Sequence, residues 1–470
     1  MGDHVRKLKA VVEILSEDEI ALVHKGSLRI LEDIGFALPN DECLDICEQM
    51  GAVVERESSI VKIPSYLIEE LLSKIKDSKN VKPEINTVPR LTGKISTQAS
   101  IIDYPNRTRR YGTLNDVIKG IAVVEHLDNI PKSNSIVVPY DVPSNMTDLL
   151  AFYTIYKYSS KPGGTYILTP ISAKYIIQMA KLMGTDVEYL VESVSPLSFR
   201  KETLEIALIF AKNNQPLRMA PMVMAGATGP ASIAGTLTLQ NSEVLISLFL
   251  IYALTSEFTD YVVGGHTIDY RTMTISFGSP NQALIGIGTA QLARFYGLNS
   301  SSNSGLTDSL EVDFQSGFEK ASSAIFSCMA GTKEIGCVGI IGADQGISLE
   351  LLTLDNEWLS AYNYIIGGIE VNEATIGIDV IENVGIGGHF ASENHTVQYM
   401  RDNFWPSRLF NRDPWGSAVL KNNRLLDKTH EFVEECIELS RNKGPVIEQN
   451  ILSELDRIIK AAEEEVLKKQ

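Results

Sequence analysis

The chain has few of the residues that build disulfide frameworks and metal sites. Its 470 residues include five cysteines, an odd and sparse set, and no Cys-x-x-Cys pair. His389 and His395 are six positions apart, which does not put both on one helix face as a zinc-binding H-x-x-x-H would. We therefore expect no disulfides, no protein-bound metal and a reducing compartment, in the simplest case the cytoplasm.

Positive charge and long apolar runs are scarce as well. The chain has 42 Lys and Arg against 59 Asp and Glu, a net charge of −17 at pH 7. A surface field of this sign repels polyanions and favours cationic small molecules or basic patches on proteins. The strongest apolar run, residues 244–254, is shorter than a membrane span, and the N-terminus lacks the apolar core of a signal peptide. We expect neither nucleic acid nor membrane among its partners.

The first quarter of the chain differs from the rest in its residue types and in the spacing of its apolar residues. Residues 17–78 repeat the apolar spacing of amphipathic helices, and residues 85–113 are rich in β-branched residues with Gly, Pro and Asn. We interpret residues 1–115 as an N-terminal cap of helices and a small sheet or hairpins.

From residue 116 on, short apolar strand candidates alternate with helix-like stretches, which predicts parallel strands joined by crossover helices. The seven strand candidates are residues 135–142, 165–170, 191–199, 217–226, 261–270, 295–305 and 336–347. No G-x-G-x-x-G follows the first of them, which favours a closed barrel over an open nucleotide-binding sheet. We predict an α/β fold, a (β/α)8 TIM-type barrel over residues 116–425, with C-terminal helices 426–470 packing on it. Its eighth strand is not located by pattern, and residues 375–385 fit a helix or a strand.

Reacting groups of such a barrel lie on the loops after its strands, so polar residues there are the site candidates. Tyr104 and Tyr140 could form an aromatic wall for a cation or could be packing. His266 could be a ligand, an acid–base group or a hydrogen-bonded histidine at the barrel rim. The glycine-rich residues 385–390 could hold a carboxylate with backbone N–H groups or form a plain turn. No nucleophile–base pair is apparent.

Several long segments resemble one family in the same order along the chain. They are LVHKGSLRILEDIGFALPNDECLDICEQMGAVVE (22–55), GLTDSLEVDFQSGFEKASSAIFSCMAGTKEIGCVG (305–339) and HTVQYMRDNFWPSRLFNRDPW (395–415). They resemble proteins of the trimethylamine methyltransferase family. The resemblance implies a (β/α)8 barrel that moves a methyl group from a methylamine or betaine to the cobalt of a corrinoid. That corrinoid (cobalamin-type) cofactor belongs to a cognate corrinoid protein, so none is expected to be bound permanently here.

One position separates two branches of this family. The archaeal amine enzymes carry pyrrolysine in the loop before D-x-Q, at or near the position of Leu310 here. An ordinary Leu points to the branch that demethylates quaternary amines such as glycine betaine. A quaternary ammonium group loses a methyl group and leaves as a neutral amine that needs no proton, so we expect no catalytic acid. Orientation of the N–CH₃ bond then provides the rate enhancement.

The resemblance suggests a substrate site in which Leu310 fills the space of pyrrolysine and tyrosines face the cation. Three anchors for the carboxylate remain open: His266, backbone N–H groups near Gln345 and Gly346, or the turn with Gly388 and His389. Two other functions also remain: a betaine-binding barrel without transfer activity, and a metal-independent barrel hydrolase or lyase that uses His266 and Asp269. A homo-oligomer is compatible with the sequence, and glycine betaine, proline betaine, carnitine and γ-butyrobetaine are not distinguished.

Overall fold

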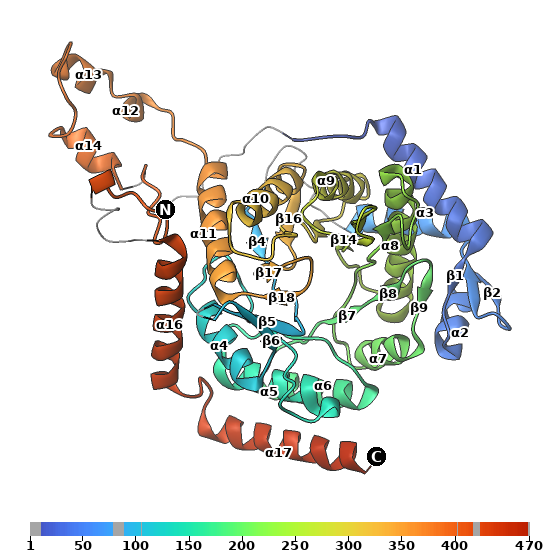
Figure 1. Ribbon diagram of the computed structural model, residues 1–470. Helices are drawn as coiled ribbons and strands as arrows, with labels where there is room; N and C mark the ends of the chain where they lie inside the picture. The colour runs from blue at the N-terminus through green and yellow to red at the C-terminus, as the bar shows by residue number, and fades with distance from the viewer. Residues whose placement is uncertain (1–10, 79–88, 105, 402, 417–423, 469–470) are drawn as a thin grey trace.

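The computed structural model describes residues 11–78, 89–104, 106–401, 403–416 and 424–468. Helices surround a central group of short strands, with the N-terminal helices on one flank and the C-terminal helices along two others (Figure 1). The fold class is α/β, as predicted.

The N-terminal segment contains three helices, as the apolar spacing predicts, and a small sheet between them. The helices are α1 (Glu17–Arg29), α2 (Asp41–Gln49) and α3 (Ser65–Ser78). The strands are β1 (Phe36–Ala37), β2 (Val53–Glu55) and β3 (Ile60–Lys62). Ser16 begins α1 in a capping box with Glu19, which satisfies N–H groups at the helix start. α1 packs against the long helix α8 of the main body, so this segment is joined to the body by a hydrophobic contact.

Eight helices follow at regular intervals and lie around the strands in chain order (Figure 1). They are α4 (Leu114–Val124), α5 (Thr147–Tyr158), α6 (Pro170–Leu182), α7 (Lys201–Lys212), α8 (Ile233–Thr255), α9 (Pro280–Phe295), α10 (Phe314–Met329) and α11 (Leu349–Ile366). α8 is long and apolar enough to cross a membrane, but 78% of its most apolar window is buried inside the protein. Burial of this extent is typical of a core helix rather than a membrane span.

The central strands precede these helices and pair in parallel. They are β4 (Thr92–Gly93), β7 (Tyr189–Val191), β10 (Leu217–Met219), β12 (Tyr261–Val263), β15 (Ser300–Ser302) and β16 (Thr332–Ile335). β12, β15, β16 and β4 form one sheet, and β10 pairs with β7. Single parallel bridges, Gln98 with Val137 and Ser133 with Pro162, extend the pairing through residues 133–162. Across the described residues the strands form five separate sheets, not one continuous closed sheet.

Hairpins and short strands lie between the central strands and the helices that follow them. They are β5 (Ser100–Asp103) with β6 (Thr108–Tyr111), β8 (Ser193–Val194) with β9 (Ser198–Phe199), β11 (Met224–Ala225) beside β13 (His266–Asp269) with β14 (Thr274–Ser276), and β17 (Ile340–Ile341) with β18 (Gly346–Ile347). The prediction of one strand over residues 336–347 is therefore wrong. The central strand β16 ends at Ile335, and the apolar run after it folds back on itself as a hairpin.

A layer of charged side chains joins several of the central strands. Lys94, just after β4, contacts Glu188, just before β7, at 3.2 Å between Nζ and Oε1. Arg218 of β10 lies 2.9 Å from Glu334 of β16 and 3.8 Å from Glu188. Ser301 of β15 donates to the same Glu334 carboxylate at 3.0 Å. Side chains from or next to five strands thus contact one another.

The C-terminal part leaves the body and returns to it. Residues 375–385 are helical: α12 (Glu373–Ile376) and α13 (Ile378–Val384) precede α14 (Asn394–Tyr399) on a projecting segment (Figure 1). The chain then forms α16 (Leu425–Lys443), which packs on α4 and α11, and α17 (Gln449–Leu467), which packs on α5 and α6.

Candidate active site

A cavity of about 590 Å³ brings together three of the predicted site residues, Tyr104, Leu310 and Gln345. They come from the β5–β6 connection, the loop before α10 and the turn between β17 and β18. The volume lies within the range of roughly 300 to 1,000 Å³ that is usual for small-molecule sites. This cavity is the candidate substrate site.

Two arginines, which the sequence analysis did not single out, give the cavity a cationic side. Arg107 and Arg109 line it together with Glu311. Arg109 donates through one guanidinium nitrogen to the side-chain oxygen of Gln345 at 3.2 Å, which leaves further N–H groups for a planar carboxylate. The available signal was the basic cluster at residues 107–110 in a strongly acidic chain.

Tyr104 is held at the cavity edge by α16. Its hydroxyl donates to Oδ1 of Asp427 at 2.8 Å, and its ring centroid lies 4.9 Å from that of His430. This hydrogen bond, together with burial, raises the pKa of the Tyr104 hydroxyl, so the side chain stays neutral at physiological pH. A neutral ring fixed in one position can present its face to a cation.

Leu310 contacts a strained turn. Gly342, Ala343 and Asp344 have φ angles of 65°, 50° and 70°, a left-handed run that is unfavourable for the alanine and the aspartate. A Cβ at position 342 would lie 2.8 Å from a methyl carbon of Leu310, so any other residue there would adopt a strained φ and displace the Leu310 side chain. The N–H groups of Gly342 and Ala343 donate to the carbonyls of Ser309 and Thr307 at 2.8 and 3.0 Å. These two hydrogen bonds therefore fix the turn relative to the loop that carries Leu310.

On the other side of this turn lies a group of acidic and phenolic side chains. The side-chain amide of Gln98 donates to Oδ1 of Asp344 at 2.7 Å. Burial raises the pKa of Asp344 and of Glu192, although Gln98 and Arg200 respectively offset part of the rise. Burial and the nearby Glu192 carboxylate also raise the pKa of the Tyr166 hydroxyl. Asp344 and Glu192 both act on the Tyr166 hydroxyl, so the two carboxyls lie near the same group and place negative charge beside the turn when they ionise.

His266 does not line the cavity. It is 1% exposed, its Nδ1 lies 3.0 Å from Oε1 of Gln282, and its ring centroid lies 4.3 Å from that of Phe277. The Gln282 amide nitrogen donates to two backbone carbonyls, so its oxygen accepts and His266 carries its proton on Nδ1. Burial lowers the pKa of His266 to about 4. The side chain is a neutral, buried histidine at physiological pH.

Asp269, the suggested partner of His266, makes other contacts. Its carboxylate pairs with Arg271 at 2.9 Å, and these contacts lower the pKa of Asp269 to about 2. Within the part of the chain that the structure describes, no hydrogen bond joins His266 to Asp269. The pair on which a hydrolase or lyase would depend is therefore not assembled.

The other predicted site residues are dispersed. Tyr140 is 54% exposed and packs its ring against Tyr111, with centroids 4.5 Å apart, outside the cavity. Gly346 adjoins the cavity through Gln345 and is buried in β18 against β5. Gly388 and His389 are exposed on the segment that projects from the body, and the fold does not bring them to the other candidates.

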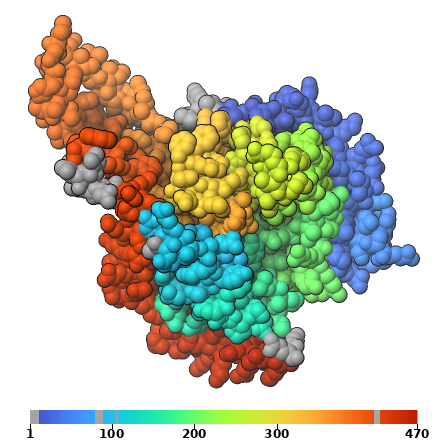
Figure 2. Space-filling view, viewed as in Figure 1, coloured from blue at the N-terminus to red at the C-terminus, as the bar shows by residue number. Residues whose placement is uncertain are grey.

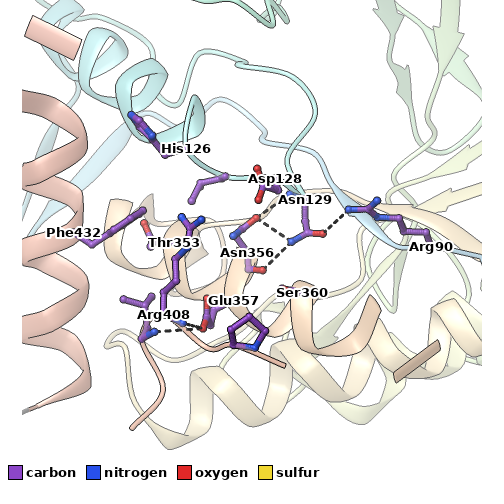
Figure 3. A pocket seen from close by; sticks show the side chains of 13 residues that line it. Arg90, His126, Asp128, Asn129, Thr353, Asn356, Glu357, Ser360, Arg408 and Phe432 are labelled. Carbon is purple, nitrogen blue, oxygen red and sulfur yellow. Dashed lines mark hydrogen bonds between the residues drawn. The ribbon is translucent and has the colours of Figure 1, made fainter. Parts of the chain in front are cut away.

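Two further cavities contain none of the predicted residues. One, of about 250 Å³, lies between the end of α4, α11 and residues 406–409 (Figure 3). The other, of about 170 Å³, lies among residues 94–97, 162–167 and 185–190. Over the described residues there is no group of three or more His, Cys, Asp or Glu placed to hold a metal ion, and the five cysteines are buried and unpaired. The donors of the large cavity suit an organic ion.

Comparison with known proteins shows the family. Residues 2–466 match the family model described as trimethylamine methyltransferase (MTTB). The chain is 28% identical over 472 residues to trimethylamine methyltransferase MttB of Desulfitobacterium hafniense (strain DSM 10664 / DCB-2), covering 96% of this chain and 94% of the relative. It is 30% identical over 434 residues to glycine betaine methyltransferase of Desulfitobacterium hafniense (strain Y51), covering 87% and 90%. The chain belongs to the trimethylamine methyltransferase family, and the predicted class of enzyme, a methyltransferase, is confirmed.

A solved structure has a related fold. The monomethylamine methyltransferase of Methanosarcina barkeri superposes with a TM-score of 0.50 at 11% identity, covering 94% of this chain and 90% of that one. At this identity the likeness concerns the fold alone.

Proposed function

We propose that this chain transfers a methyl group from a quaternary amine with a carboxylate, of which glycine betaine is an example, to the Co(I) of a corrinoid held by a cognate partner protein. One observation carries the proposal. Leu310, at the position where the resemblance implies pyrrolysine in the archaeal branch, lines a cavity that has both an aromatic ring and arginines. A zwitterion needs an aromatic ring for its ammonium group and arginines for its carboxylate. A simple methylamine needs only the aromatic ring.

The roles of the side chains follow from their positions. Arg109, with Arg107 beside it, would hold the carboxylate by charge-assisted hydrogen bonds. The ring of Tyr104 would favour the ammonium end through a cation–π contact of about 0.5 to 2 kcal/mol. The carboxyl of Asp344, which precedes Gln345 in the turn, would add negative charge next to the cavity. Leu310 would limit the space around the N-methyl groups and so direct one of them out of the cavity.

The chemistry requires little else from the chain. The N–CH₃ bond breaks with its electron pair left on nitrogen, the methyl group bonds to cobalt, and the amine leaves neutral. No proton moves, which agrees with the neutral and enclosed state of His266. The contribution of the protein is orientation of the reacting bond, which can supply several kcal/mol of the barrier.

We infer that the central strands close into an eight-stranded barrel. Four observations support this: the parallel pairing of β12, β15, β16 and β4, the bridges through residues 133–162, the pair β7–β10, and the hydrogen bond from Gly264 to Pro221 beyond β10 and β12. The charged layer that joins Lys94 to Glu188 and Arg218 to Glu334 also suits a closed interior. The first strand would then be residues 92–98, and the boundary between cap and barrel would fall near residue 90 instead of 115.

The cysteines, all free, support a cytoplasmic location.

The deciding experiment is a substrate panel with the purified chain and a cognate corrinoid protein reduced to Co(I). Glycine betaine, proline betaine, carnitine, γ-butyrobetaine, trimethylamine and tetramethylammonium are compared by the cobalt absorption spectrum and by detection of the demethylated amine. We expect methyl-Co(III) and one equivalent of demethylated amine with at least one carboxylated quaternary amine. Binding of betaine without either product would indicate the non-catalytic barrel, and turnover without cobalt would indicate a hydrolase or lyase.

A further inference from the structure

The C-terminal helix α16 supplies part of the wall of the candidate active site. Leu426, in its first turn, lines the large cavity. The helix packs on α4 and α11, and the space-filling view shows it in red beside the β5–β6 hairpin in cyan (Figure 2). The next residue, Asp427, contacts Tyr104 of that hairpin across 323 positions of sequence. A helix that was predicted only to pack on the barrel therefore reaches the substrate cavity.

Tyr104 has a position that leaves its side chain free to move unless another element fixes it. β5 ends at Asp103 and β6 begins at Thr108, so Tyr104 lies in the connection between the two strands, outside their paired residues. A side chain in such a connection can adopt more than one staggered rotamer. Ordering it only when a substrate binds costs conformational entropy and lowers affinity. Contacts that fix the ring beforehand should therefore improve binding.

α16 contacts the side chain of Tyr104 at two points. Oδ1 of Asp427 accepts the hydrogen bond of the hydroxyl at 2.8 Å. The ring of His430 lies 4.9 Å from the Tyr104 ring between centroids, with an angle of 48° between the ring planes. Asp427 and His430 are three positions apart and so share one face of the helix. One rigid element thus holds both the hydroxyl and the ring.

His430 is itself fixed by residues that reach the cavity wall. Its Nδ1 lies 2.9 Å from Oε1 of Glu350, and because a carboxylate only accepts, the imidazole donates from Nδ1. The buried side chain of Glu350 also accepts at 3.0 Å from the hydroxyl of Ser348, which lines the cavity. Ser348, Glu350 and His430 therefore connect the wall of the cavity to the ring of Tyr104.

We propose that Asp427 and His430 are positioning residues that fix the ring of Tyr104 for the ammonium group of the substrate. The inference rests on the proposed function, in which this ring meets the cation. The hydrogen bond to a carboxylate also leaves more electron density on the phenol, which strengthens the attraction of its ring for a cation. Asp427 and His430 contribute to affinity in this way through Tyr104, and they take no part in breaking the N–CH₃ bond.

The test measures methyl transfer by variants of the full-length chain to the cognate corrinoid protein, with the quaternary amine that the substrate panel identifies. Asp427→Ala should raise KM about three- to tenfold with kcat nearly unchanged, because binding must then order the ring. Asp427→Asn keeps an acceptor oxygen for the hydroxyl and should recover most of this loss. His430→Ala should also raise KM, and His430→Gln less so, since glutamine can still donate to Glu350.

Tyr104→Phe distinguishes positioning of the ring from other effects of Asp427. Phenylalanine keeps the ring but has no hydroxyl, so this variant should have about the same KM as Asp427→Ala. Adding Asp427→Ala to Tyr104→Phe should then cause no further rise, because the two residues act through one hydrogen bond. Rises in KM that multiply in the double variant would overturn the proposal.

Two other residues of α16 provide matched controls. Val433 is 1% exposed in the contact of α16 with the body, and Glu434 is exposed. Val433→Ala should lower the melting temperature and leave KM unchanged, and Glu434→Ala should change neither. A rise in KM with Val433→Ala equal to that with Asp427→Ala would show that α16 acts only through the stability of the fold, which would overturn the proposal.

Failure of this proposal can be told apart from failure of the proposed function. Wild type that turns over a quaternary amine with a KM that Asp427→Ala does not change would overturn the positioning role alone. Wild type that transfers no methyl group from any quaternary amine would contradict the proposed function and the positioning role with it.

Discussion

Lys320 and Asp355 form an ion pair between α10 and α11 in which both side chains are 1% exposed and the charged atoms lie 3.1 Å apart. The pair also contacts the backbone at the start of the hairpin that carries the strained turn of residues 342–344. Asp355 accepts from the N–H of Gly339 at 2.7 Å, and the Lys320 ammonium lies 3.4 Å from the carbonyl of Ile340. The buried charges thus fix the start of β17, two residues before the strained turn.

We predict that Lys320→Met will destabilise the protein by about 3 to 5 kcal/mol, because it leaves a buried carboxylate without its cation. Burial raises the pKa of Asp355, so the loss should grow with pH as that carboxyl ionises. Adding Asp355→Asn should recover much of the stability, since it removes the remaining charge. Denaturant unfolding of both single variants and the double variant tests this, and simple additivity of the two single effects would contradict it.

Arg109→Gln should raise KM for a carboxylated quaternary amine at least tenfold with little change in kcat. The variant loses a charge-assisted hydrogen bond to the carboxylate, an interaction of about 1.5 to 3 kcal/mol. Tetramethylammonium has no carboxylate, so its turnover, where measurable, should be unaffected. Equal losses with both substrates would mean that Arg109 only supports Gln345 and the turn.

Asp344→Asn should act in opposite directions on stability and on binding. Burial raises the pKa of Asp344 above the unfolded value, so the folded protein binds this proton more tightly than the unfolded chain does. Wild-type stability therefore falls as pH rises from the ordinary carboxyl pKa through the raised one, and the penalty persists above it. The variant keeps the acceptor for Gln98 but lacks the charge.

The expected result is a melting temperature above that of wild type at pH 7 to 8 and close to it at pH 3.5, together with a higher KM for the cationic substrate. Thermal melts across this pH range and steady-state kinetics measure the two effects. A variant with lower stability at pH 8 would show that the carboxylate has a stabilising partner in the folded state.

His266 should affect acid stability and not the activity profile. Its folded pKa of about 4 lies below the unfolded value of about 6.5, so the unfolded state takes up a proton first as pH falls. Stability should decline between pH 6.5 and 4 by about 3 kcal/mol. His266→Gln should lack this decline and should keep methyl transfer without a new inflection near pH 6.5. Complete loss of activity in a folded variant would restore an acid–base role.

Some residues of the candidate active site could be predicted from the sequence, and others could not. Leu310, Tyr104 and Gln345 were expected near the substrate, and they do line one cavity. Arg107 and Arg109, on the same hairpin as Tyr104, were not expected, because nothing in the local pattern shows that β5 pairs with β18 beside the turn. The glycine-rich residues 385–390 have the composition of an anion site, yet they lie between α13 and α14 on the projecting segment, because composition does not fix where a segment lies in the fold.

Strand assignment failed for a related reason. Residues 336–347 are as apolar as a central strand, but their glycines at 339 and 342 adopt left-handed φ angles and fold the run into a hairpin. Residues 92–98 form a short, polar segment. Only its pairing with β16 and with residue 137 shows that it belongs with the central strands.

The sequence by itself determined the alternation of strands and helices, the family and the acidic character of the chain, because periodicity, long ordered motifs and composition are local or additive properties. The tertiary structure alone decided which loops share a cavity, that His266 is buried and neutral, and that the segment with α12, α13 and α14 projects from the body. The shared cavity depends on contacts between residues hundreds of positions apart, such as Tyr104 with Asp427 and Arg109 with Gln345. A contact of that kind leaves no trace in the residues on either side of it.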